Sequence, residues 1–517
     1  MLFHTLVRRV KDAVEGAAQL LHTTPENLGI AALSAFAAAV AYSVITRKKR
    51  KGRSIPGPKG YPIFGSLFDF AAYGNRGKTA DYFTALHEAH GDTVAINLMG
   101  RTLVLSRDLI LTHKALTDPT SFRKTDFGAQ RTKGITDNAL FVMEDGEVWR
   151  HHRKFLQPAF GPQHLRHMGT VAREDAGTLC EGWVSKAKHG SGAVVVDVFH
   201  EFTALTLDII GTVAFSYNFQ ASNNYHHGRE ADGQQILQDI AKQLQERFAN
   251  PPFLWRLVGV SNASPRLLKT RQYVDGLLNK VIASKRADVA AAGKDWKAKD
   301  VLDRLLSLDE KGKPVFTEAE IIGEVMAFFF AGHETTANTL TFIALELSRN
   351  PAIQFKLKNE IKTLVAKLTT PIMIENLADL KYLDNVVKEA QRRHSVVGAL
   401  GRSPITTVEH DGHILTPDMR VMMNIRAIHM DPRYWKNPEA FDPDRWDGPV
   451  VPHAFLPFGD GPRNCIGQKM AVIEAKMVMV EILKRFTLEF VEQELDFVSY
   501  ATYGLKKGLQ IRMKLDA

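Results

Sequence analysis

Cysteine is almost absent from this chain: Cys180 and Cys465 are the only two in 517 residues. Two cysteines cannot build the disulfide framework of a small secreted protein, and sparse cysteine is typical of reducing compartments. We therefore expect the body of the protein to fold without disulfides. A free cysteine is most often buried and inert, and we expect this of Cys180, in the stretch AGTLCEGW.

Nucleotide-binding loops and basic surface patches are also missing from the sequence. It holds no Walker-type lysine loop, and no Gly-x-Gly-x-x-Gly opens a strand–helix–strand unit. The formal net charge is +9, but six positive charges lie in one run between Arg47 and Arg53. These absences argue against a built-in flavin or nicotinamide domain and predict no nucleic-acid partner.

The longest uncharged stretch lies near the N-terminus. Residues 28–46, LGIAALSAFAAAVAYSVIT, would span about 28 Å as a helix, close to the thickness of a bilayer core. The basic run that follows would stay on the cytoplasmic side. We expect an N-terminal segment (1–27), a transmembrane anchor (28–46), a basic and Pro/Gly-rich linker (47–62) and a folded body (63–517). A buried helix, a cleaved signal or an organelle transit segment are the alternatives, the last because basic residues also precede the stretch.

The folded body is predicted to be mainly α with small β-sheets. Branched and apolar residues indicate short strands near residues 93–98 and 102–105 and around 488–497 and 505–514. Thr317 and Glu320 form a capping-box pattern that predicts a helix from Glu318 to Arg349. A helix of that length measures about 48 Å and crosses a whole domain. A further helix is predicted from Lys381 to Ser395.

Cys465 lies in a loop that differs from an ordinary cysteine environment, FGDGPRNCIG (458–467). Its glycines permit backbone angles that point several N–H groups at one sulfur. The residues that follow the cysteine, 466–486, predict a long amphipathic helix. The start of that helix, those donors and the nearby Arg463 would favour a thiolate. A thiolate is a nucleophile or a metal ligand, and the loop holds no histidine to act as a base. A single sulfur beside an apolar shelf, with Phe458 as part of it, suits haem iron.

The loop resembles the haem-binding signature of the cytochrome P-450 superfamily, Phe-x-x-Gly-x-Arg-x-Cys-x-Gly. Every fixed position matches, at Phe458, Gly461, Arg463, Cys465 and Gly467. The resemblance implies the cytochrome P-450 fold, with haem b between the long central helix and the helix after the cysteine loop. Cys465 would be the axial thiolate, and residues 63–517 would form a haem-thiolate catalytic domain.

A second motif lies inside the long helix, AGHETT (331–336). A threonine hydroxyl can bond the carbonyl four residues earlier, here that of Ala331 for Thr335, and bend the helix. A kinked structural helix with a solvated acid is one interpretation. The stretch also resembles the family pattern Ala/Gly-Gly-x-Asp/Glu-Thr-Thr/Ser, which implies that Thr335 steadies bound dioxygen and Glu334 joins a proton relay.

The resemblance also implies supporting residues. Glu389 and Arg392 match the family's Glu-x-x-Arg pair, and Arg445 in FDPDRW would complete a buried ionic triad that supports the cysteine loop. The family's usual Leu-x-Pro after this pair is replaced by Arg-His-Ser-Val at 393–396, which is expected to alter one pocket wall. The expected ligands of the haem propionates are Trp149, Arg153, Arg402 and His453.

The function implied is insertion of one atom of dioxygen into an apolar substrate of lipid, fatty-acid or terpenoid type. Electrons would come from a separate NADPH-cytochrome reductase, with cytochrome b5 as a second donor. Lys469 and Lys476 are candidates for the reductase docking face, and a solvated helix face is the alternative. The implied location is the endoplasmic reticulum membrane, with one membrane pass and a cytoplasmic catalytic domain; a plastid or mitochondrial membrane is the alternative. Substrate contacts are expected at 127–140, 328–331, 396–400 and 501–504. Residues 328–331 could equally pack as core, and four consecutive helical residues cannot all face one pocket.

Two other functions remain open on the sequence. A haem-thiolate isomerase or dehydratase of lipid peroxides would share the scaffold, but that class tends to lack the acid–threonine pair at 334 and 335. A haem-binding carrier without turnover would have no need of a proton relay.

Overall fold

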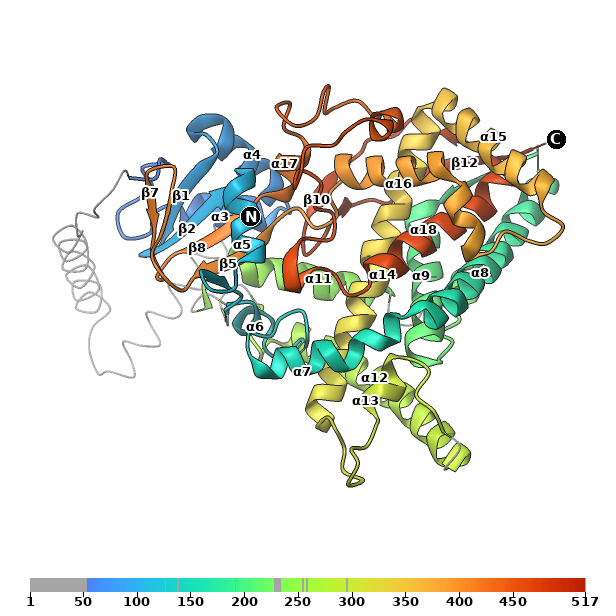
Figure 1. Ribbon diagram of the computed structural model, residues 1–517, viewed down its shortest axis with the longest axis horizontal. Helices are drawn as coiled ribbons and strands as arrows, with labels where there is room; N and C mark the ends of the chain where they lie inside the picture. Colours follow the sequence, from blue (N-terminus) through green and yellow to red (C-terminus); the bar gives the residue numbers. More distant parts are fainter. Residues whose placement is uncertain are drawn as a thin grey trace.

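The computed structural model describes residues 54–516 with short gaps at 126, 137–138, 191, 227–233, 253–254, 257–258 and 294–295. The predicted segments 1–27 and 28–46, and the linker as far as residue 53, lie outside the described residues. Figure 1 shows a large helical body with a smaller β-rich part at one side. The prediction of a mainly α fold with small sheets is confirmed.

The β-rich part is built around one five-stranded sheet. Its strands follow the order β1-β2-β8-β5-β3, and only β2 and β8 are parallel. Their bounds are Thr93–Leu98 for β1, Arg101–Ser106 for β2, Arg420–Met423 for β8, Leu400–Pro404 for β5 and Phe122–Arg123 for β3. The Pro/Gly segment packs against this sheet, because the amide of Ala95 donates to the carbonyl of Pro56 at 2.8 Å.

The other strands form three smaller units. A three-stranded sheet has the order β4-β12-β9, and two hairpins pair β6 with β7 and β10 with β11. Their bounds are Ala193–Asp197 (β4), Gln510–Leu515 (β12), Phe486–Phe490 (β9), Val408–His410 (β6), His413–Leu415 (β7), Phe497–Ser499 (β10) and Tyr503–Leu505 (β11).

Helix α14 (Glu318–Arg349) runs through the centre of the helical part and packs along α9 (Val198–Phe215) (Figure 1). Within the described chain, α9 is the one helix long and apolar enough to cross a membrane, and most of it is buried in the protein core. Helix α8 (Pro162–Lys188) lies against α18 (Gln468–Leu483), the helix that follows the cysteine loop. The cysteine loop is thereby brought beside the protein core.

The remaining helices surround this centre. Their bounds are Leu67–Asn75 (α3), Thr79–His90 (α4), Leu109–Thr117 (α5), Phe127–Thr132 (α6), Glu147–Leu156 (α7), Ala221–His226 (α10), Gln234–Ala249 (α11), Pro265–Ala292 (α12), Val301–Leu305 (α13), Pro351–Lys367 (α15), Lys381–Arg393 (α16) and Ile425–His429 (α17).

The start of α14 is the predicted capping box. The hydroxyl of Thr317 accepts from the amide of Glu320 at 3.3 Å, and the Glu320 carboxylate accepts from the amide of Thr317 at 2.8 Å. Each residue satisfies a backbone donor that the helix leaves unpaired. The predicted bounds of this helix are confirmed.

Helix α18 differs from its prediction as an amphipathic helix. Its residues from Glu474 to Leu483 are all buried, including the charged Glu474 and Lys476. Helices α8, α14 and α16 contact it from several sides, so its charged residues do not mark a solvent face. Helix α16 also ends at Arg393, two residues before the predicted end.

We predict that Thr317→Ala lowers the free energy of unfolding by about 1 kcal/mol, because one N-terminal amide of α14 loses its acceptor. Urea denaturation measures the change. Thr363→Ala is the control, because this exposed hydroxyl bonds only the carbonyl of Asn359 in its own helix. An equal loss in the two variants would contradict the capping role.

Candidate active site at the cysteine loop

The cysteine loop is held in place by glycines and by a cap. Gly461 has φ of 69°, and a Cβ there would lie 2.3 Å from the carbonyl oxygen of Leu116 in α5. Only glycine fits that approach and that backbone angle. The Asp460 carboxylate accepts from the amide of Gly461 at 2.7 Å and begins the 3-10 turn η6 (Gly461–Arg463). The amide of Cys465 closes the loop by donating to the carbonyl of Phe458 at 3.0 Å.

The Cys465 sulfur is set deep in the protein and remains accessible. Burial is the largest influence and raises the pKa of its thiol, while a hydrogen bond from the Gly467 amide and the charge of Arg153 lower it. Its side chain is nevertheless exposed, in contrast to Cys180, which is buried with its pKa raised to about 12 by burial. A deep, accessible sulfur of this kind ionises readily when a cation binds it.

Three residues share the face of α14 that belongs to this site. Phe328, Ala331 and Thr335 stand three and four positions apart, which places them one above the other. The ring centroid of Phe328 lies 5.8 Å from that of Phe160, and Phe160 in turn contacts Gly467 of the cysteine loop. Ala331 is exposed although it lies in the central helix. Helix α14 therefore presents a small apolar face on the side of Cys465.

Phe329 and Phe330 do not share this face. Phe329 is buried, and its ring packs against Phe219. The expectation that the four residues 328–331 cannot all face one pocket agrees with this arrangement.

Glu334 is half-buried, with one carboxylate oxygen enclosed, and it is held by a residue that the motif did not reveal. One carboxylate oxygen accepts from the Thr502 hydroxyl at 2.5 Å, and the other has no hydrogen-bond partner. Burial raises the pKa of Glu334 to about 7, and the Thr502 bond lowers it. The interpretation as a solvated acid is wrong, and the carboxyl can hold or release a proton near neutral pH.

Thr502 and Thr335 complete this arrangement. Thr502 lies in the turn of the β10–β11 hairpin, and Asn338 on the next turn of α14 donates to its hydroxyl at 3.4 Å. The hydroxyl of Thr335 donates to the carbonyl of Ala331 at 2.8 Å, as the sequence predicts. Residues 501–504 are expected to contact substrate, and among them Thr502 also reaches the acid.

A cluster of cations surrounds one carboxylate beside the loop. Arg463 donates to Asp145, and its guanidinium lies 3.8 Å from the ring centroid of Trp149. Arg402 is buried and donates to the carbonyl of Gly401 at 2.9 Å.

The positive charges of this cluster lower one another's pKa values. Burial lowers the pKa of Lys124 to about 7, and the charges of Arg463 and Arg402 lower it further, while Asp145 opposes them. Burial likewise lowers the pKa of Arg463 to about 10, and one of its terminal nitrogens is buried without an acceptor. This unsatisfied donor and the cationic surplus call for further carboxylate groups.

The four expected propionate ligands therefore separate into three places. Trp149 and Arg402 lie at this cluster. Arg153 is turned to the cysteine loop, where it donates to the backbone and side-chain oxygens of Asn464 at 2.8 and 2.9 Å. The structure does not bring His453 to the cluster, because its ring stacks on His113 at the protein surface. Lys124 and Asp145 were not found from sequence, since no motif marks them.

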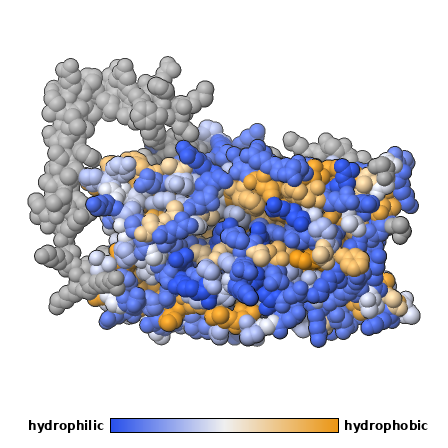
Figure 2. All heavy atoms as spheres, turned by 90° about the horizontal axis from the view of Figure 1, so that it is seen from above, coloured by the Kyte–Doolittle hydropathy of each residue, from blue (hydrophilic) through white to orange (hydrophobic). Residues whose placement is uncertain are grey.

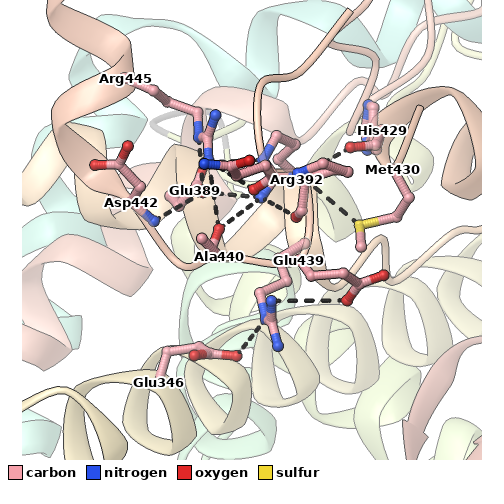
Figure 3. A network of polar contacts seen from close by, with 12 residues as sticks. Glu346, Glu389, Arg392, His429, Met430, Glu439, Ala440, Asp442 and Arg445 are labelled. Carbon is pink, nitrogen blue, oxygen red and sulfur yellow. Dashed lines mark hydrogen bonds and ion pairs between the residues drawn. The ribbon is translucent and has the colours of Figure 1, made fainter. Parts of the chain in front are cut away.

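The ionic support beneath the site is a closed network around Glu389 (Figure 3). Glu389 and Arg392 are fully buried and form two parallel bonds of 2.9 and 2.8 Å. Arg445 and Trp446 donate to the same carboxylate at 2.9 and 3.0 Å. Arg392 also donates to the carbonyls of His429, Pro438 and Ala440. The network ties α16 to the segment that precedes the cysteine loop.

The segment that replaces Leu-x-Pro makes a second tie to the loop. The Nδ1 atom of His429 lies 2.7 Å from the Ser395 hydroxyl, and its Nε2 accepts from the amide of Leu456 at 2.8 Å. Burial lowers the pKa of His429 to about 3, so the ring stays neutral. His394 is buried too, stacked on Phe342 and 2.6 Å from Glu346. The unusual stretch thus forms buried polar bonds where the family has a proline turn.

The donor set fits an iron porphyrin. Cys465 offers one soft sulfur, and the α14 face offers apolar contact. The orphaned Arg463 donor and its cationic neighbours offer partners for two propionates. Two observations show that the residues around the cysteine loop fit an iron porphyrin: the accessible sulfur of Cys465 and the unsatisfied donor of Arg463.

Comparisons with known proteins agree with this geometry. The model of the family Cytochrome P-450 matches residues 55–504. The chain is 28% identical to cytochrome P-450 3A27 of Oncorhynchus mykiss, with 92% of this chain and 90% of the relative covered. It is 26% identical to cytochrome P-450 4d2 of Drosophila melanogaster, with 89% and 93% covered. It is 27% identical to cytochrome P-450 3A11 of Mus musculus, with 88% and 90% covered.

We predict that Glu389→Ala lowers the free energy of unfolding by about 3–5 kcal/mol. The buried Arg392 and the half-buried Arg445 would both lose their carboxylate partner. Chemical denaturation of the purified protein measures this. Glu489→Ala is the matched control, since its ion pairs with Arg512 and Lys514 are long, at 3.9 and 3.7 Å, and exposed. A loss below about 1 kcal/mol for Glu389→Ala, within the range of exposed pairs, would rule out a supporting role.

Proposed function

Because this chain belongs to the cytochrome P-450 family, whose members are haem-thiolate monooxygenases, we propose that it hydroxylates an apolar lipid, fatty-acid or terpenoid-like substrate. The observation that carries the proposal is Cys465: a deep, accessible sulfur in a glycine loop, bonded by the Gly467 amide and backed by Arg153. The cofactor proposed is haem b.

In this proposal different residues of the chain hold different parts of the haem. Cys465 supplies the axial sulfur, and Arg463, Arg402 and Lys124 face the propionates. When bound, the haem supplies the activation of dioxygen. Arg153 remains tied to Asn464 and keeps the loop in register, while Trp149 fixes the plane of the Arg463 guanidinium.

Glu334 is proposed to supply protons to the reacting side of α14. Its pKa of about 7 places it between its two protonation states at physiological pH. Thr502 holds one oxygen, and the other is unbonded and can donate onward. Thr335, one residue along the helix, offers the next hydroxyl. The proton therefore passes from Glu334 toward Thr335 through water, on the face that Ala331 leaves open.

Apolar side chains from α14 and β5 line the proposed substrate pocket. Phe328 and Ala331 come from α14, and Leu400 from β5. The Leu400 side chain contacts Gly459 of the cysteine loop, where a Cβ would lie 3.2 Å from it. The amide of Tyr503 donates to the carbonyl of Val396 at 2.7 Å and ties two of the expected recognition segments together. These contacts support an apolar substrate and leave its chemical identity to experiment.

Electrons are proposed to come from a separate protein, NADPH-cytochrome reductase, with cytochrome b5 as a second donor. The absence of nucleotide-binding loops in the sequence supports this. Lys469 and Lys476 were candidates for the docking face. Lys469 is exposed, but Lys476 is buried and bonded to Asp384. Lys476 therefore does not belong to the proposed reductase-docking face.

A single-pass anchor in the endoplasmic reticulum membrane, with a cytoplasmic catalytic domain, is the proposed location, and a plastid or mitochondrial membrane is the alternative. Large apolar side chains are exposed near the start of the described chain: Tyr61, Phe68 and Tyr73. Aromatic side chains are enriched at membrane–water interfaces. Figure 2 shows one face of the molecule, on which apolar patches lie among hydrophilic side chains.

We predict that Cys465→Ser abolishes the strongly red-shifted absorbance of the reduced, carbon monoxide-bound protein, because oxygen replaces the thiolate. Difference spectroscopy measures the change. Cys180→Ser is the control and retains the band. A normal band in Cys465→Ser would overturn the assignment of the ligand.

We predict that Thr502→Val moves the falling limb of the pH–rate profile to higher pH. The Thr502 hydroxyl stabilises the Glu334 carboxylate, so its loss raises the Glu334 pKa above about 7 and the acid keeps its proton at higher pH. Reductase-dependent product formation across pH measures the limb. Thr178→Val, on the surface of α8, leaves it unchanged. A limb that stays in place, or moves to lower pH, in Thr502→Val would exclude Glu334 as the proton donor.

A further inference from the structure

Two histidines and an aspartate meet at the surface beside the cysteine loop. His113 comes from α5, His453 from the segment before the loop, and Asp460 from the loop itself. The Nδ1 atoms of His113 and His453 lie 3.2 and 3.6 Å from the same carboxylate oxygen of Asp460, Oδ2. The two imidazole rings are stacked, with centroids 3.7 Å apart and an angle of 30° between their planes.

These separations match the spacing of ligands around one small metal ion. Nitrogen and oxygen ligands lie about 2.0–2.2 Å from zinc, so the edge of a tetrahedral site measures about 3.3 Å. The two histidine-to-aspartate distances, 3.2 and 3.6 Å, fall on either side of that value. One ligand atom from each of the three residues lies within 4.8 Å of the others. A cation placed among them contacts all three after small side-chain rotations.

Ordinary His–Asp hydrogen bonds occur elsewhere in the protein and look different. His410 lies 3.0 Å from Asp108, and His200 lies 3.0 Å from Asp197. In each of these pairs a single imidazole approaches the carboxylate. At Asp460 two imidazoles from separate segments converge on one oxygen. His453 also adopts φ of 62°, a left-handed backbone angle that is uncommon outside glycine.

We propose that His113, His453 and Asp460 bind a divalent transition-metal ion of the zinc type. Imidazole ligands select zinc, copper or nickel over magnesium or calcium, which take oxygen ligands. The three side chains are 40%, 44% and 33% exposed, so an ion reaches them from solvent and water completes its coordination. The site is separate from the Cys465 site and does not rest on the proposed function.

The ion would link α5 to the start of the cysteine loop. Asp460 uses its other oxygen, Oδ1, to cap Gly461 at 2.7 Å, and Gly461 packs on the carbonyl of Leu116 in α5. Metal binding through Oδ2 adds a second tie between the same two segments. Occupancy of the site therefore restrains residues 461–465, which carry the sulfur.

Zinc binding is tested on the full-length, haem-loaded protein without a polyhistidine tag, by competition with a chromophoric chelator. We expect one saturable Zn²⁺ per chain and no competition by Mg²⁺. His113→Ala and His453→Ala should each weaken zinc binding by about tenfold or more. Loss of a residue that only hydrogen-bonds a metal ligand already costs about tenfold in metal affinity, and loss of a ligand should cost at least as much. Asp460→Asn should do the same while it keeps the acceptor for the Gly461 amide.

His410→Ala is the matched control, because it removes one histidine from a single His–Asp pair and should leave zinc affinity unchanged. Zinc-edge X-ray absorption should show nitrogen and oxygen neighbours at about 2.0–2.2 Å with imidazole scattering; a sulfur shell at about 2.3 Å would place zinc on a cysteine and overturn the proposal. Absence of saturable binding, or equal affinity in wild type and the three site variants, would also overturn it. Hydrogen exchange gives an independent readout: Zn²⁺ should slow the amides of residues 461–465 in wild type and not in His113→Ala.

Discussion

The carboxylate of Glu389 is the point on which the architecture around the cysteine depends. It lies fully buried and receives bonds from two arginines, a tryptophan and the amide of Asp442. A carboxylate buried in this way is stable only while each of its oxygens is satisfied. The segment from His429 to Trp446 is therefore fixed to α16. The His429 ring in turn accepts a hydrogen bond from the amide of Leu456, two residues before Phe458, and so fixes the start of the cysteine loop.

The charges around the site are arranged in two contrasting environments. On the loop side, Lys124, Arg402 and Arg463 crowd around Asp145, and the surplus is positive. On the α14 side, Glu334 stands without an ion-pair partner among the described residues and is held by a neutral hydroxyl. The first environment favours binding of anionic groups, and the second favours a carboxyl that exchanges protons near neutral pH.

Local patterns in the sequence predicted what depends on near neighbours. The capping box at Thr317, the bounds of α14 and the Thr335 bond to Ala331 all involve residues within one or two helical turns. The contacts that were missed join residues far apart in the chain: Thr502 to Glu334, and Arg463 to Asp145. No periodicity encodes such pairs, because they exist only after the sheets and helices have packed.

Helix α18 shows the limit of local patterns. It was expected to be amphipathic, yet the surrounding helices bury both Glu474 and Lys476. Tertiary packing therefore overrode the local pattern. For His453, which was expected at a haem propionate, the structure shows a ring stacked on that of His113.

The proposed function requires one bond, from the Cys465 sulfur to iron. Iron-edge X-ray absorption on the purified protein tests this bond most directly. We expect one sulfur neighbour in the first shell of a porphyrin-bound iron, retained in Cys180→Ser and lost in Cys465→Ser. A first shell of nitrogen and oxygen alone in the wild-type protein would contradict it.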